Sequence, residues 1–166
     1  MAVTSDAFKL ALGQFASGVT VVTAAQADVR FGLTVSAFCS VSADPPQVLV
    51  CIANKSPARD VIAQQRHYAV NILSHEQADL GARFAGMMPR VTDRFAGVGT
   101  HDGVHGCPLL DHALATLECA VTQEVAGGAH TIFIGRVLTC ETGEGAPLLY
   151  HARDWRQLAE APVSVN

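Results

Sequence analysis

The run from Phe31 to Ser42 constrains the fold more than any other part of the chain, because its side chains alternate with a period of two. One set, mostly apolar, points one way: Leu33, Val35, Ala37, Cys39 and Val41. The other set, mostly hydroxyl-bearing, points the opposite way: Thr34, Ser36, Phe38, Ser40 and Ser42. Asp44-Pro45-Pro46 predicts a turn at the end of this strand, and Val48 to Ala53 is an apolar run typical of a strand covered on both faces. The chain is therefore expected to build its core mainly from β-strands.

The remaining elements follow from periodicity and capping signals. Residues 5–16 predict a short amphipathic helix packed on the body, with Ser5 as its cap and Phe8, Leu12 and Phe15 on one face. Helices are also expected after Ser56-Pro57 and after Ser74, where Gln77 has capping-box spacing and Leu80 and Phe84 face inward. Further strands are predicted at residues 19–24, 67–73, 114–123, 131–140 and 147–151, and residues 86–107 as a long surface excursion. The order of these predicted helices and strands along the chain contains too few alternating βα units for a Rossmann sheet. A mainly antiparallel β-barrel with helices on its outside fits better.

Composition narrows the class of protein. The 166 residues are 49% hydrophobic and 16% charged with a net charge of −4, which argues against a disordered chain and a strongly basic nucleic-acid binder. A single domain, residues 1–166, is the default at this length. The N-terminus lacks a secretion signal and no apolar run approaches the roughly 20 residues of a membrane span, so we expect a cytoplasmic protein. The five cysteines contain no CxxC pair, so neither a disulfide framework nor a zinc site is predicted. The low charged fraction suggests that a second subunit covers part of the surface.

Two features suggest a ligand with a polar ring and a phosphate. The hydroxyls of Thr34, Ser36, Ser40 and Ser42 suit a planar heterocycle, although a solvent-facing strand edge explains them equally well. The helix start from Asn54 to Arg59 offers unpaired N–H groups, and Lys55 and Arg59 add positive charge. An ordinary capped helix with solvated cations is the alternative for this second feature.

Histidines offer a weaker signal. His101, His105 and His112 lie in or beside the irregular segment without acidic partners at ligand spacing, so no metal site is predicted. His130 differs because it follows the Gly127-Gly128 turn and enters a strand. It could face a ligand there, or it could be an ordinary strand-end residue.

Taken in order, these segments resemble the short-chain flavin reductase family, the reductase components of two-component flavin-dependent monooxygenases. The resemblance is carried by residues 15–23 (FASGVTVVT), 32–42 (GLTVSAFCSVS) with Pro45-Pro46 and 48–52, 54–56 (NKS), 70–73 (VNIL), 83–85 (RFA), and His130 followed by 132–135 (IFIG). It runs from about residue 7 to residue 158. One departure stands out: the family often has Gly-Gly-aromatic after Tyr-His near the C-terminus, whereas here Tyr150-His151 is followed by Ala152-Arg153-Asp154-Trp155.

The resemblance implies a split β-barrel that binds FMN or FAD at a homodimer interface and reduces it with NADH or NADPH. Reduced flavin would then pass to a partner monooxygenase. Thr34, Val35, Ser36 and Ala37 would contact the isoalloxazine ring; Ser40, Val41, Ser42, Ala53, Asn54, Lys55 and Ser56 the ribityl and phosphate part; and Arg83 and Phe84 the rest of the flavin. His130, Tyr150, His151 and Trp155 would lie toward the nicotinamide, with His130 as a positioning group. The Ala152-Arg153 departure puts the backbone path, and so the nicotinamide contacts, in question.

Other functions stay open at this point. A pyridoxamine-phosphate-oxidase-like enzyme would share the barrel but need a basic cluster, which the few lysines and arginines disfavour. A non-catalytic flavin-binding or electron-carrier module is a second alternative, and a purely structural interaction protein is a third. No arginine pair marks a 2′-phosphate pocket, so the sequence leans toward NADH.

Overall fold

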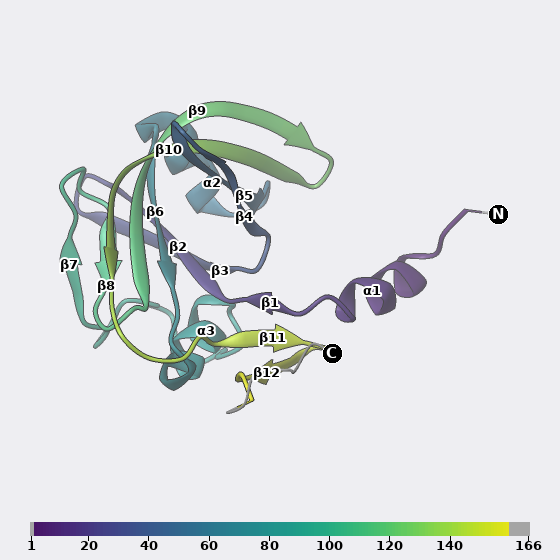
Figure 1. Ribbon diagram of the computed structural model, residues 1–166. Helices are drawn as coiled ribbons and strands as arrows, with labels where there is room; N and C mark the ends of the chain where they lie inside the picture. Colours follow the sequence, from purple (N-terminus) through teal and green to yellow (C-terminus); the bar gives the residue numbers. More distant parts are fainter. Residues whose placement is uncertain (1, 160–166) are drawn as a thin grey trace.

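The computed structural model describes residues 2–159 and is built around one sheet of seven antiparallel strands (Figure 1). The strand order is β3-β2-β6-β9-β10-β5-β4. The bounds are β2 Thr20–Gln26, β3 Val29–Val35, β4 Phe38–Ala43, β5 Pro46–Ala53, β6 His67–Ile72, β9 Ala115–Gly127 and β10 His130–Thr142. The edge strands β3 and β4 follow each other in the chain, and the Cys51 amide of β5 donates a hydrogen bond to the Ala37 carbonyl between them. The sheet therefore curls into a barrel, and the predicted mainly β architecture is confirmed.

Helix α2 (Pro57–Gln65) packs against the barrel through Ala58, Val61 and Ile62. Ser56 and Pro57 occupy the predicted cap and first-turn positions, although the Ser56 side chain makes no capping hydrogen bond. The core beneath the helix draws on six strands and contains Val22, Val35, Val50, Ile52, Tyr68, Cys119 and Phe133. This single cluster explains why the strand assignments from periodicity hold, since each strand sends alternate residues into it.

A second core lies under the short helices η1 (His75–Gln77) and α3 (Ala78–Phe84). The predicted capping box is present, because the Ser74 amide donates to Gln77 Oε1. Phe84 packs edge-on against Phe95 with ring centroids 5.0 Å apart. A Cβ on Gly32 would lie 2.6 Å from the Phe84 ring, so only glycine allows β3 to approach α3 this closely.

Phe95 also corrects the prediction that residues 86–107 form a long surface excursion. Its ring is buried in the second core. The segment further contains β7 (Thr100–Asp102), which pairs with β8 (Pro108–Leu110). The absence of a hydrophobic period hid both features, because one anchoring phenylalanine and a three-residue strand produce no periodic pattern.

The predicted continuous strand from Phe31 to Ser42 is interrupted. β3 ends at Val35 and β4 begins at Phe38, and the exposed residues Ser36 and Ala37 carry the chain from one edge of the sheet to the other. The break contains neither glycine nor proline, so no local signal in the sequence indicated it. The expectation that β5 is covered on both faces also fails within one chain, because Val48, Val50 and Ile52 are buried while Leu49 and Cys51 are only half-buried.

Helix α1 (Ser5–Gly13) has no buried residue and projects away from the barrel (Figure 1). Thr4, not Ser5, caps it, with its hydroxyl accepting a hydrogen bond from the Ala7 amide at 3.2 Å. Phe8 is 55% exposed, Leu12 56% and Phe15 76%. The prediction that this helix packs on the body of its own chain is therefore wrong, and its apolar side chains are left uncovered.

A small three-stranded sheet lies beside the barrel. It consists of β1 (Ser17–Gly18), β11 (Leu149–His151) and β12 (Asp154–Arg156), with β11 in the middle. The predicted last strand corresponds to β11, whereas β12 was not predicted. No helix within the described residues is long and apolar enough to cross a membrane.

Candidate functional site

The largest cavity beside the predicted ligand strand has a volume of about 660 Å³ and lies between α1, the Ser36–Ala37 link and the β11–β12 hairpin. Its lining comprises Lys9, Leu12, Gly13, Phe15, Ser17, Ser36, Ala37, Tyr150, His151, Ala152 and Arg153. A smaller cavity of about 150 Å³, lined by Val19, Thr34, Ser36, Ala85, Met87, Tyr150 and Trp155, shares Ser36 and Tyr150 with it. Together they form a hollow of the size and character that small-molecule sites have, mostly apolar with a few polar groups.

Ser36 and Ala37 reach this hollow because the chain leaves the barrel at that point. Thr34 lines the smaller cavity, but its hydroxyl donates a 2.7 Å hydrogen bond to the Gly81 carbonyl of α3. The Thr34 hydroxyl proton is thus already used, whereas the Ser36 side chain is exposed. Of the four hydroxyl-bearing residues predicted to face a ligand, Ser36 is therefore the one best placed to bind in this hollow.

The β11–β12 hairpin supplies the aromatic wall. Tyr150 and Trp155 pair across the two strands with ring centroids 5.1 Å apart and planes at 60°. The two residues at the tip, Ala152 and Arg153, have φ values of 51° and 65°, in the left-handed region that glycine adopts easily. The chain therefore makes the tight turn here without glycine, and the predicted nicotinamide contacts of this hairpin stay a prediction.

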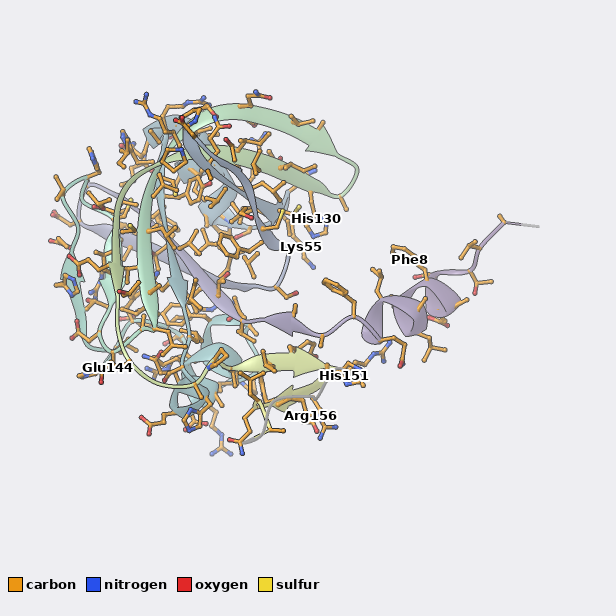
Figure 2. All side chains as sticks on the ribbon, viewed as in Figure 1. Phe8, Lys55, His130, Glu144, His151 and Arg156 are labelled. Atoms are coloured by element: carbon orange, nitrogen blue, oxygen red, sulfur yellow. The ribbon has the colours of Figure 1, made fainter. Side chains whose placement is uncertain are left out.

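Lys55 and His130 lie next to each other on the barrel, as Figure 2 shows. Register places His130 opposite Ala53, and the Asn54 amide donates to the Ala129 carbonyl at 3.0 Å. The Asn54 side chain is held in turn, since Nδ2 donates to the Gly128 carbonyl and Oδ1 accepts from the Thr131 hydroxyl. The structure thus fixes the turn before α2 against the β9–β10 hairpin and leaves Lys55 exposed.

The predicted nicotinamide group is divided by this arrangement. Tyr150, His151 and Trp155 belong to the small sheet, whereas His130 stands beside Lys55 at the start of β10 (Figure 2). Within one chain, His130 is grouped with the predicted phosphate residues rather than with the aromatic pair.

Arg59 has partners that the sequence did not indicate. Its Nη2 lies 2.8 Å from Glu124 Oε1, its Nη1 3.0 Å from Asp60 Oδ1, and its Nε donates to the Thr131 hydroxyl at 3.2 Å. These contacts join α2 to both strands of the long hairpin. The Arg59 guanidinium is therefore engaged in ion pairs and a hydrogen bond within the chain, and Lys55 is left as the available cation at this helix start.

Several other predicted contacts fall on residues engaged elsewhere. Phe84 is 1% exposed and Val35 is also in the core, so neither side chain presents a face to a ligand. Arg83 Nη1 donates to the Ala96 carbonyl at 2.9 Å. Ser40 and Val41 are exposed and Ser42 half-exposed along β4, away from the lining of the two cavities.

Sequence reasoning missed the contributions of α1 and of the hairpin tip. Lys9, Leu12 and Phe15 line the large cavity from one side, and Ala152 and Arg153 line it from the other. The link between them is a hydrogen bond from the Ala152 amide to the Gly13 carbonyl at 2.8 Å, together with the β1–β11 pairing. Only the non-glycine turn signalled that this region differed from the expected pattern.

Comparison with known proteins places this geometry in context. The sequence model described as "Flavin reductase like domain" matches residues 12–159. The reductase component of a 4-nitrophenol 4-monooxygenase/4-nitrocatechol 2-monooxygenase from Rhodococcus opacus is 43% identical over 144 residues, covering 87% of this chain and 76% of that protein. An NADH-dependent flavin reductase from a Rhodococcus species is 38% identical over 159 residues, covering 94% and 88%.

A solved structure, the flavin reductase PheA2 in its native state, superposes with a TM-score of 0.89 at 39% identity. The match covers 95% of this chain and all of that one. The predicted split-barrel class is thereby confirmed.

Proposed function

This chain belongs to the flavin reductase-like family of oxidoreductases, and we propose that it reduces FMN or FAD with NADH and releases the reduced flavin to a partner monooxygenase. The observation that carries the proposal is the hollow formed by the Ser36–Ala37 link and the Tyr150–Trp155 pair. Apolar and aromatic walls suit a flat heterocycle, and backbone groups at the strand break can bind its polar edge. The activity is assigned to the whole chain as one domain.

The residues present fit a flavin in a specific way. Ser36 and Ala37 would hold the ring system where the strand is interrupted. Lys55, with the amides at the start of α2, would bind the phosphate, because an exposed cation and a helix N-terminus both favour an anion. The lack of an ion pair at Lys55 among the described residues, in contrast to Arg59, supports this division of roles.

The hydride chemistry is supplied by the flavin and the nicotinamide when both are bound. The protein's task is then to hold two flat rings in contact and to exclude water from between them. Tyr150 and Trp155 provide an aromatic wall for this purpose. His130 and His151 act as positioning groups, and no side chain is required to move a proton.

We further propose that two copies of the chain form a homodimer. The outward face of β5 and β10 carries the half-buried apolar residues Leu49, Cys51, Ile132 and Ile134, and Val125 beside them is 44% exposed. Helix α1 adds its uncovered Phe8 and Leu12, and Phe15, two residues after the helix ends, is uncovered as well. Apolar surface of this extent calls for a partner. A second copy could also bring its own His130 toward the aromatic pair from which this chain's His130 is separated.

The proposed reaction would take place in the cytoplasm, where nicotinamide nucleotides are available. The reducing conditions there agree with five free cysteines.

The test of activity is anaerobic bleaching of FMN and FAD by NADH and NADPH, in the four combinations. Reduction of more than one flavin molecule per chain supports the proposal, because the flavin must then leave between cycles. Flavin binding without nucleotide oxidation would identify a non-catalytic flavin carrier instead.

Oligomeric state has a separate test by light scattering at micromolar concentration, where about twice the 17.4 kDa chain mass is expected. Phe8→Glu, on the uncovered face of α1, should shift the population toward the monomer. The matched control is Asp6→Ala on the same helix, at a position that is already polar and exposed.

A further inference from the structure

The large cavity has an uneven distribution of charge. Its lining contains Lys9, His151 and Arg153 but neither aspartate nor glutamate. This is unusual on a chain with a net charge of −4. A cavity lined by basic side chains and by no carboxylate favours an anionic group on the ligand that it binds.

We propose that Lys9 and Arg153, with the imidazole of His151, form a subsite for a phosphate group of the pyridine nucleotide. This inference rests on the proposed function, because it assigns part of that nucleotide to a particular set of residues. Arginine and lysine are the usual phosphate-binding side chains, and the imidazole ring adds a hydrogen-bonding nitrogen.

The guanidinium of Arg153 is available for such a contact. Arg59 is paired with Glu124 at 2.8 Å and Arg156 with Asp154 at 3.2 Å, but Arg153 has no carboxylate within salt-bridge distance in the part of the chain that is described. Lys9 has only a loose contact of 3.8 Å with Asp6, and both side chains are mostly exposed, so water and salt screen it. Binding a phosphate would therefore require little rearrangement of existing ion pairs.

The place of the subsite indicates which ligand it serves. The flavin phosphate is assigned to Lys55 at the start of α2, on the barrel beside His130, whereas His151 lies on the small sheet (Figure 2). FMN carries one phosphate and FAD two adjacent ones, so neither flavin requires two separate cationic sites. The cations near the Tyr150–Trp155 pair thus remain for the second substrate, whose phosphates are either the diphosphate common to NADH and NADPH or the 2′-phosphate of NADPH.

The backbone at Arg153 makes a clean experiment possible. Because φ is 65° there, glycine fits the turn better than arginine does. Arg153→Gly removes the charge while relieving the backbone, so the variant should melt no lower than the unaltered protein. Arg153→Lys keeps a charge, and Arg90→Ala, at an exposed position in a turn after α3, is the matched control.

Initial rates at saturating flavin with NADH and with NADPH test the subsite. Arg153→Gly should raise the KM for the nucleotide about tenfold with little change in kcat, and Arg153→Lys should recover most of the loss. Added salt should raise KM more in the unaltered protein than in Arg153→Gly. An equal effect on both nucleotides assigns the diphosphate, and an effect confined to NADPH assigns the 2′-phosphate.

Unchanged KM values for both nucleotides in Arg153→Gly would overturn the inference while leaving the proposed function intact. A weakened flavin affinity with normal nucleotide KM would also overturn it, because the subsite would then serve the flavin. Failure of the unaltered protein to oxidise either nucleotide refutes the proposed function itself.

Discussion

Gly81 allows a sharp test of how the aromatic wall is positioned. It lies in α3, its carbonyl accepts the Thr34 hydroxyl at 2.7 Å, and its missing side chain makes room for Trp155. A Cβ at this position would lie 3.2 Å from Trp155 Cη2 and 3.3 Å from Leu148 Cδ2. Gly81→Ala therefore pushes directly on the ring that lines the smaller cavity.

Two opposing terms set the effect on stability. Replacing glycine by alanine inside a helix is favourable by about 0.8–1.0 kcal/mol. Carbon atoms normally stay about 3.5–4.0 Å apart, so Trp155 must move by roughly half an ångström, and overpacking of this kind costs about 1–3 kcal/mol. Trp155 is only half-buried and can shift at the lower end of that range. We expect the two terms nearly to cancel in the melting temperature.

The reaction should respond more strongly than the stability. A displacement of 1 Å in a group that positions substrate can cost about a hundredfold in rate, so a shift of half that size is expected to lower kcat/KM for the nucleotide roughly tenfold. Trp155 is the only tryptophan in the chain, which makes its fluorescence emission a direct report of the displacement. Stopped-flow flavin reduction and emission spectra of Gly81→Ala are the two measurements.

Trp155→Phe is the matched background, because phenylalanine lacks the indole atoms that the new Cβ would meet. There, only the 3.3 Å approach to Leu148 Cδ2 remains, so Gly81→Ala should recover part of the helix gain and leave the residual rate unchanged. If Gly81→Ala raised stability by the full helix gain in the unaltered background, with emission and rate unchanged, Trp155 would not be held against Gly81 and the reasoning would be refuted.

Four other predictions concern single groups. Lys55→Ala should weaken flavin binding, by about 1.5–3 kcal/mol for a desolvated contact, as measured by binding titration. Arg59→Ala should mainly lower the melting temperature, because it breaks the ion pair with Glu124. His130→Ala should raise the KM for NADH or slow flavin reduction by about tenfold in rapid-mixing experiments, with flavin affinity unchanged. Glu118 is 1% exposed and accepts hydrogen bonds from the Val104 and His105 amides, so Glu118→Gln should destabilise the chain by about 1.5–3 kcal/mol and speed hydrogen exchange at those two amides. Burial raises the pKa of Cys107 and Cys119 to about 12 from a usual 9.0, so above pH 9 the folded state keeps thiol protons that the unfolded chain loses. The free energy of unfolding, measured in equilibrium melts, should therefore fall between about pH 9 and 12.

The parts of the fold that followed from the sequence are those set by local patterns. The capping box at Ser74 and Gln77 depends on residues three apart, and the buried set Val48, Val50 and Ile52 depends on strand periodicity. Both signals act over a few residues, where side-chain chemistry and backbone geometry are directly coupled. The capping box and the buried face of the strand could therefore be predicted without knowledge of the rest of the chain.

The sequence was uninformative where contacts between distant residues decide the environment of a side chain. Arg59 looked like a free cation at a helix start, but Glu124, far along the chain, neutralises it. Phe84 was placed by motif beside the flavin, yet Phe95 covers its ring. The break after Val35 reflects closure of the barrel, since the chain must pass from one sheet edge to the other. Neither these long-range contacts nor the closure of the barrel can be inferred from the spacing of neighbouring residues.

The site joins two parts of the fold that contribute different properties. The barrel offers a rigid strand break at Ser36–Ala37, fixed by the large core beneath it. The small sheet offers Tyr150, Trp155 and the strained tip, attached through the short pairing of β1 with β11 and the Ala152–Gly13 hydrogen bond. A two-residue strand holds less firmly than a seven-stranded barrel, so the side of the hollow formed by the small sheet, where we propose that the nucleotide binds, is the part able to open. A reductase that must admit one substrate and release another in each cycle needs this difference, because a uniformly rigid pocket would retain the flavin that the partner monooxygenase requires.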